Sequence, residues 1–334
     1  MKIYTLLFAL VAALALSLAA CGSDDNASAT PTHASTVTAT AAATVASGPF
    51  FDCTAAHPGT AADTSAFPVT VTDGVGNTVT LTAPPASIAS LDAAHTEILY
   101  AIGAASEVKA VDKTSDCPAA AVSLQKVDAF NPSVETITAL HPDLVVLFYD
   151  PGDLVSSLNA AGIKVLNLKT PSDINGVYDQ IELLGKVTGH AGDADMLVTN
   201  MANQVHAIAS QVIGKTGPTV YHEVDNTYYS AGPGSFIDDL YKTLGAKNIA
   251  DSTGEAYPQL SSEAIIAANP DVIILADEAA GESATTVAAR PGWSVIAAVK
   301  QHHVYAIDPN ILGRAGPRIV DALRALEAAL YPGS

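Results

Sequence analysis

Basic side chains are scarce in this chain of 334 residues, which has 15 lysines and arginines against 34 aspartates and glutamates. The resulting formal net charge of −19 argues against a nucleic-acid-binding surface and against a polybasic contact with a membrane. Acidity of this kind also keeps an exposed protein soluble. The charge therefore argues against nucleic-acid and membrane-surface partners, but it does not identify a partner.

Long apolar runs are also missing, apart from the first twenty residues. Residues 1–20 combine one lysine with a run of Leu, Ala, Phe and Val, and they end in small residues. This pattern predicts a secretory signal peptide, and the run is too short for a convincing membrane span. The sequence Leu18-Ala-Ala-Cys21 resembles a bacterial lipobox, which implies that Cys21 carries a diacylglyceryl group and anchors the chain to the cell membrane.

Cysteine is rare, with only Cys53 and Cys117 left after Cys21. An exported location permits these two to form a disulfide. The sequence does not show whether they approach each other, so a disulfide and two free thiols both remain open. Neither cysteine has a neighbouring His or Asn in a recognisable catalytic motif.

Other signatures of catalysis and metal binding are lacking as well. The turn Gly232-Pro-Gly-Ser-Phe236 is not a nucleophile elbow, a P-loop or a full dinucleotide fingerprint. We therefore expect neither an enzyme nor a cofactor, and a purely structural lipoprotein is a further alternative. The histidines are scattered without ligand spacing, so no metal site is predicted, although a zinc- or manganese-binding lipoprotein is the nearest rival function. They include His95, His141, His206 and His222.

The strongest pattern present is an internal repeat. The segment Ser133–Leu147 recurs without a gap at Ser261–Leu275. Each copy reads Ser-x-Glu-x-Ile-x-Ala-x-x-Pro-Asp and then an apolar run, which predicts a capped helix, a turn and a buried strand. Glu135 and Glu263 occupy the same place in the two copies. Two matched carboxylates indicate a symmetric contact with something that has two equivalent parts.

Strand and helix patterns alternate through both halves. Alternating β-branched residues around a turn predict a hairpin between Val69 and Leu81, and strands alternate with helices after it. We predict an α/β fold with two Rossmann-like lobes, whose mostly parallel sheets are joined by a long α-helix. The predicted regions are the signal peptide, a flexible Ser/Thr/Ala-rich tether, an N-terminal lobe, a linking helix and a C-terminal lobe, at 1–20, 21–66, 67–171, 172–214 and 215–334. The linking region has helical spacing throughout, and its glycines leave one helix or two consecutive helices open.

Several motifs together are similar to those of the extracytoplasmic binding proteins of ABC importers. They are Ser90–Ala104, Asn131–Glu135, Tyr257–Glu263 and Arg314–Arg318. The match is to the sub-family with a helical linker, which binds vitamin B12, haem and iron-siderophores. The resemblance implies that Glu135 and Glu263 contact a permease dimer, which works with its ATPase subunits. We expect a monomer, held outside the cytoplasm at the cell surface or in the periplasm.

Ligands of such folds bind beyond the carboxyl ends of the strands. The residues expected there are His95, Phe130, Tyr149, Tyr228, Tyr229, Tyr257 and Arg314. Aromatic faces with polar tips suit a large planar macrocycle. A corrinoid is the first choice of ligand, followed by an iron-siderophore or haem. Catecholate siderophores would call for several arginines, and haem would call for an axial Tyr or His.

Overall fold

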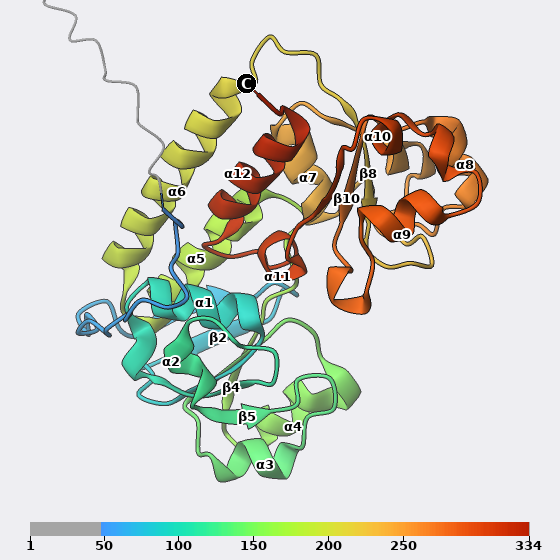
Figure 1. The fold of residues 1–334 in the computed structure, drawn as a ribbon. Coiled ribbons are helices and arrows are strands. Elements are labelled where there is room, and N and C mark those ends of the chain that lie inside the picture. The colour runs from blue at the N-terminus through green and yellow to red at the C-terminus, as the bar shows by residue number, and fades with distance from the viewer. Residues whose placement is uncertain (1–47, 334) are drawn as a thin grey trace, which may run out of the picture. The chain divides into compact units, whose positions relative to one another are not determined.

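The computed structural model describes residues 48–333 (Figure 1). All of them lie within a single compact unit. The predicted signal peptide and Cys21 lie outside the described residues. Within the described part, no helix combines the length and the apolar character needed to cross a membrane.

The strands and helices alternate along most of the chain. The strands are β1 (Val69–Thr72), β2 (Thr78–Leu81), β3 (Ile88–Leu91), β4 (Val108–Asp112), β5 (Gln125–Val127), β6 (Leu144–Leu147), β7 (Lys164–Asn167), β8 (Thr219–Glu223), β9 (Lys247–Asn248), β10 (Val272–Leu275) and β11 (Val304–Ala306). The α-helices are α1 (Ala93–Ala101), α2 (Ala119–Val122), α3 (Val134–Ala139), α4 (Leu154–Ala160), α5 (Ile174–Thr188), α6 (Ala191–Gln211), α7 (Phe236–Thr243), α8 (Ser262–Ala268), α9 (Ala284–Ala289), α10 (Ala297–Lys300), α11 (Pro309–Leu312) and α12 (Ile319–Leu330).

Two parallel sheets form the two lobes. The N-terminal sheet has the order β5-β4-β3-β6-β7, and the C-terminal sheet has the order β11-β10-β8-β9. All pairs within both sheets are parallel, whereas β1 and β2 form a separate antiparallel hairpin. The order β4-β3-β6-β7 therefore corresponds to β9-β8-β10-β11. The predicted α/β class with parallel sheets is confirmed.

The sequence repeat has a matching structure in each lobe. Ser133 and Ser261 cap α3 and α8, and each hydroxyl accepts a backbone N–H at 3.1 Å. Shortly after each helix comes a residue with left-handed backbone, His141 at φ 49° after α3 and Asn269 at φ 47° after α8. His141 is therefore part of the turn that leads from α3 into β6.

The aspartate of each repeat turn fastens the start of the neighbouring strand. The Asp143 carboxylate accepts N–H bonds from Ala86 and Ser87 at 2.8 and 3.0 Å, just before β3. The Asp271 carboxylate accepts bonds from the Thr219 N–H and hydroxyl at 2.9 and 2.8 Å, at the start of β8. The Pro-Asp pair thus sets where the central strands of both sheets begin.

Each sheet is buried on both faces, because β6 and β10 consist entirely of buried aliphatic residues. One face of each sheet contributes to a shared core, which also takes in α5, α6 and α12. The opposite faces pack in separate clusters, one in each lobe. The linking helices and the closing helix are therefore part of the core that the two lobes share.

The linking region contains two consecutive helices, α5 and α6. They separate at Gly189, where φ is +80°, a conformation that favours glycine. A Cβ at Gly185 would lie 2.4 Å from the Cβ of Ala194, so glycine also permits the close approach of α5 to α6. Of the two arrangements that the sequence left open, the structure has two helices.

The sequence predicts a flexible tether as far as residue 66, but residues from Gly48 onward are attached to the body of the protein. Cys53 and Cys117 are joined by a disulfide, with Cα atoms 4.9 Å apart. Phe51 is only 5% exposed and belongs to the shared core. Polar composition suggested a free segment, whereas two phenylalanines and a cysteine attach its last part.

Candidate ligand-binding site

A buried carboxylate joins the N-terminal lobe to the C-terminal segment. Glu97 on α1 is fully buried, and it accepts hydrogen bonds from two arginines. Arg314 Nη1 lies 2.9 Å from Glu97 Oε1, and Arg318 contacts both carboxylate oxygens at 2.6 and 3.0 Å. Burial raises the pKa of Glu97, and the hydrogen bonds from Arg318 and Arg314 oppose that rise. The C-terminal segment is thereby fastened to α1.

Arg314, a predicted ligand residue, is largely occupied by protein groups. Besides Glu97, it donates to Asp116 at 2.6 Å, to the Thr114 carbonyl at 2.9 Å and to the Asn310 side chain at 2.9 Å. Burial lowers the pKa of Arg314, but the bonds to Asp116 and Glu97 outweigh this effect and raise it. The Arg314 guanidinium is therefore charged, and its charge is already balanced by the carboxylates of Glu97 and Asp116.

His95 and Arg314 lie at one small cavity. This cavity has a volume of about 50 Å³ and is lined from the ends of β3, β6 and β7, from α5 and from the C-terminal segment. Ligand pockets usually measure about 300–1,000 Å³, so this space can hold only water-sized groups. His95 is 2% exposed, and its Nε2 lies 3.2 Å from Gln180 Oε1. Its Nδ1 lies 3.2 Å from Asp92 without the alignment of a hydrogen bond.

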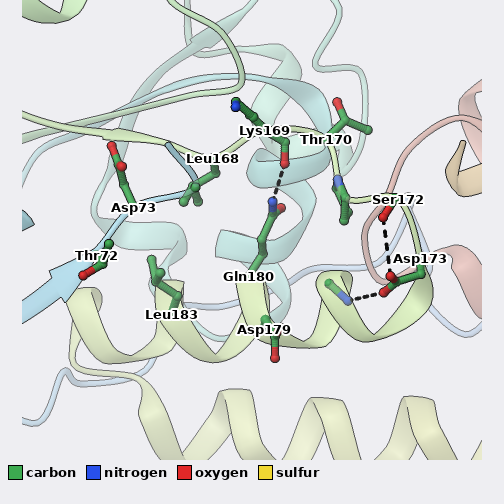
Figure 2. Close-up of a pocket in the computed structure, with 13 residues that line it drawn as sticks. Thr72, Asp73, Leu168, Lys169, Thr170, Ser172, Asp173, Asp179, Gln180 and Leu183 are labelled. Carbon is green, nitrogen blue, oxygen red and sulfur yellow. Dashed lines mark hydrogen bonds between the residues drawn. The ribbon is translucent and has the colours of Figure 1, made fainter. Parts of the chain in front are cut away.

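A larger cavity of about 390 Å³ adjoins the small one (Figure 2). It lies between the β1–β2 hairpin, the β7–α5 connection and α5, and it shares Gln180 with the small cavity. Gln180 donates to the Lys169 carbonyl at 2.6 Å, as Figure 2 shows. None of the residues predicted to bind ligand lines this larger cavity. Its size alone therefore does not make it the ligand site.

The predicted aromatic residues of the N-terminal lobe form one cluster. Phe130 is 67% exposed, and its ring lies 5.9 Å from Phe148 and 6.1 Å from Tyr149. The Tyr149 hydroxyl donates to the Phe130 carbonyl at 3.1 Å. Asp128 accepts the Phe130 N–H at 3.1 Å, so the loop that presents the exposed ring is held from both sides.

The predicted aromatic residues of the C-terminal lobe lie on two paired loops. Tyr229 and Gln259 form an antiparallel bridge, and the Ser230 N–H donates to the Pro258 carbonyl at 2.9 Å. Tyr229 is 42% exposed and Tyr257 is 53% exposed. Burial of the hydroxyl raises the pKa of Tyr257. These two rings are available to a ligand at the carboxyl side of the second sheet.

Tyr228 is held by a residue that the sequence motifs did not single out. Trp293 is fully buried, and its ring stacks on Tyr228 at a centroid distance of 5.7 Å. Its Nε1 donates to the Ser262 hydroxyl at 2.9 Å, one residue before Glu263. Arg290 covers the Trp293 ring at 4.6 Å. Only its rarity, as the one tryptophan of the chain, could have drawn attention to it.

An acidic group surrounds Arg290 at the carboxyl ends of β8 and β10. Arg290 makes two bonds of 2.6 Å to Glu223 and one of 2.7 Å to Glu282. Asp277 is 7% exposed, and neither of its carboxylate oxygens has a hydrogen-bond partner. Burial, followed by repulsion from Glu223 and Glu282, raises the pKa of Asp277 to about 6.

The two repeat glutamates occupy equivalent exposed positions. Glu135 and Glu263 both lie in the first turn of their helix, and both are exposed. A carboxylate there is stabilised by the helix dipole, by about 0.3–1 kcal/mol. The structure thus leaves both side chains accessible to a partner.

The histidines considered for a metal site have separate surroundings. His222 is fully buried and lies 2.8 Å from the Tyr241 hydroxyl, and burial lowers its pKa to about 4. His206 lies on α6, and His141 lies in the turn between α3 and β6. Among residues 48–333, no three His, Cys, Asp or Glu side chains come together as a metal-binding group.

Two parallel-sheet lobes joined by linking helices are the architecture of a two-lobe binding protein. The family model for periplasmic binding proteins matches residues 88–311, and the chain belongs to that family. It is 35% identical to YvrC, an uncharacterized ABC transporter substrate-binding lipoprotein of Bacillus subtilis (strain 168), over 80% of this chain and 87% of that protein. The chain is thus a substrate-binding component of an ABC importer, as the motifs predicted.

Two further relatives differ in their ligands. A cobalamin-binding protein of Halobacterium salinarum (strain ATCC 29341 / DSM 671 / R1) is 29% identical over 79% of this chain and 74% of its own length. The crystal structure of the periplasmic haem-binding protein HutB of Vibrio cholerae superposes with a TM-score of 0.68 and 25% identity, over 74% of this chain and 99% of that chain. The family therefore leaves the ligand of this chain open.

We predict that Glu97→Gln lowers the free energy of unfolding by about 3 kcal/mol or more, because two buried guanidiniums lose their shared charged partner. Urea unfolding at neutral pH measures this change. Glu135→Gln is the matched control, since Glu135 is exposed, and its effect should stay below about 1 kcal/mol, the most that the helix dipole contributes there. Equal stability of the two variants would contradict the assigned role of Glu97.

Asp277 should make stability depend on pH. Its folded pKa of about 6 exceeds the ordinary 3.8, so its contribution to stability is present below about pH 4 and is lost as the pH rises through 6. Asp277→Asn should therefore raise the free energy of unfolding at pH 7.5 by about 1–3 kcal/mol and leave it unchanged near pH 4. Thermal or urea unfolding across this range tests the effect, with Asp195→Asn as an exposed control. A difference that does not depend on pH would refute it.

Proposed function

We propose that the chain captures a corrinoid between its two lobes and delivers it to the permease of an ABC importer. The choice of ligand rests on one observation, the pairing of the arginines with carboxylates of the protein. Arg290, Arg314 and Arg318 are each already paired with carboxylates. A ligand that relies on several carboxylates or catecholates would need free guanidiniums, whereas the corrin ring carries neutral amide side chains.

Accessible aromatic rings support the same proposal. The exposed Phe130 and the half-buried Tyr149 lie on one lobe, and the exposed Tyr229 and Tyr257 lie on the other. Aromatic rings bury a large apolar area at small entropic cost, which suits a macrocycle with two broad faces. The relationship to a cobalamin-binding protein agrees with this choice.

Haem is the second candidate, because an exposed tyrosine could serve as its axial ligand. The two histidines considered for that role, His95 and His222, are 2% and 0% exposed. Burial therefore leaves the tyrosines as the stronger axial candidates. Within residues 48–333, no group of three His, Cys, Asp or Glu side chains supports zinc or manganese binding.

Transport in this proposal requires no covalent chemistry. The ligand binds at the carboxyl ends of the two sheets, the lobes close to a limited extent, and Glu135 and Glu263 dock on the two permease subunits. Charge-assisted contacts of this kind set orientation and association rate more than affinity. ATP-driven rearrangement of the permease then opens the lobes. A lipid anchor at Cys21 keeps the complex near the membrane.

Titration calorimetry with cyanocobalamin should show one-to-one binding, and Phe130→Ala or Tyr257→Ala should weaken it about tenfold or more. Val295→Ala is the matched control, since Val295 is also an exposed apolar residue, at 52%. Binding of haem or of a ferric siderophore in place of cobalamin would replace the ligand and keep the transport role. Binding of none of these chelates, with stabilisation by zinc or manganese, would move the metal-ion function to first place.

Charge reversal at the repeat glutamates should separate docking from capture. Glu135→Arg and Glu263→Arg should leave ligand affinity unchanged and should reduce uptake by cells that depend on this importer. The double variant should abolish uptake, because both glutamates that would pair with basic groups of the permease become basic themselves. Asp195→Arg on α6 is the control for the added charge. Normal uptake by the double variant would remove the docking role.

A further inference from the structure

The chain before β1 crosses from one lobe to the other. Residues 48–63, which we call the strap, begin at α12 of the C-terminal lobe. The Asp321 carboxylate on α12 accepts the N–H groups of Phe50 and Phe51 at 2.7 and 3.3 Å. Arg324, one turn further on, donates to the Gly48 carbonyl at 2.8 Å. These contacts fasten the start of the strap to α12.

A covalent bond then fastens the strap to the N-terminal lobe. Cys53 is joined to Cys117 between β4 and α2, and its carbonyl accepts the Ala119 N–H at 2.7 Å. Between the two attachments, Phe51 is buried and its ring stacks on His57 at 4.3 Å. Cys53 is only three positions after Phe50 in the chain. The segment between these two attachments is therefore too short to extend much further.

The rest of the strap follows the joint between the linking helices. The Thr60 N–H donates to the Gly103 carbonyl at 2.8 Å, and the Asp63 N–H donates to the Gly189 carbonyl at 2.8 Å. The Thr60 hydroxyl also lies 3.0 Å from His190 Nδ1. Gly189 is where α5 ends, and a Cβ there would lie 2.9 Å from the Asp63 carbonyl oxygen. The strap thus covers the position at which the linking helices would bend.

We propose that the strap restrains movement of the two lobes, with the Asp321 contacts and the Cys53–Cys117 bond acting in series. A restraint in series transmits force only while both of its ends hold. Release at either end therefore removes the restraint that the strap provides, and release at both ends adds nothing further. The bonds of Arg314 and Arg318 to Glu97 still join the two lobes in every case. The family match begins at residue 88, so the strap lies outside the part of the chain that the family model matches.

The test measures the distance between the lobes by electron–electron double resonance. Spin labels are placed on a ketone-bearing amino acid, so that the cysteines stay untouched, at Asn159 on α4 and at Val295. Both positions are exposed. The variants are Cys53→Ser with Cys117→Ser, Asp321→Ala, and the combination of all three. Asp52→Ala is the matched control, because the Asp52 side chain accepts its hydrogen bonds from Thr54, which is also part of the strap.

Both partial variants should broaden the distance distribution by equal amounts, and the combination should be no broader. Hydrogen exchange at the Phe50 and Phe51 amides should accelerate roughly tenfold or more in Asp321→Ala, because two bonds to a charged acceptor are lost. Released amides with an unchanged distance distribution would overturn the proposal, and so would additive broadening. Asp321→Asn, which keeps one acceptor, serves if Asp321→Ala unfolds, and it should give an intermediate width.

Discussion

The structure depends on one buried charge, the carboxylate of Glu97. An isolated carboxylate inside a core is costly, and the cost is offset only when cations and hydrogen bonds surround it. Here Arg314 and Arg318 supply both, and they come from a segment more than two hundred positions later in the chain. The closing segment must therefore lie against α1 in the native fold. That requirement places the C-terminal segment beside the carboxyl edge of the first sheet, where the candidate site lies.

The repeated Ser-x-Glu and Pro-Asp elements impose the same local geometry on both lobes. In each lobe a serine caps a short helix, and an aspartate fixes the start of a central strand. Because parallel strands that begin in register also end in register, the loops after β6 and β10 emerge at equivalent places. This explains how one short pattern positions an exposed glutamate at an equivalent place in each lobe, in the first turn of the helix that precedes the central strand.

Charge at the candidate site is balanced internally. Arg290 is matched by Glu223 and Glu282, and Arg314 is matched by Glu97 and Asp116. The arginines therefore orient loops and join segments, and the exposed aromatic rings remain as the binding surface that we propose. A formal charge of −19 is compatible with the proposed corrinoid, because the proposed recognition rests on apolar area and not on attraction between opposite charges.

Sequence alone determined the α/β class, the repeat, most strand positions and the family, because each follows from local periodicity, capping residues and turn chemistry. It could not determine the two linking helices, since a glycine such as Gly189 breaks a helix only where packing requires positive φ. Nor could it reveal that Arg314 pairs with Glu97, that Trp293 holds Tyr228, or that the segment before β1 is fastened at both ends. Those contacts join residues distant in the chain. Only the tertiary structure decides them, because burial and pairing depend on which surfaces the folded core brings together.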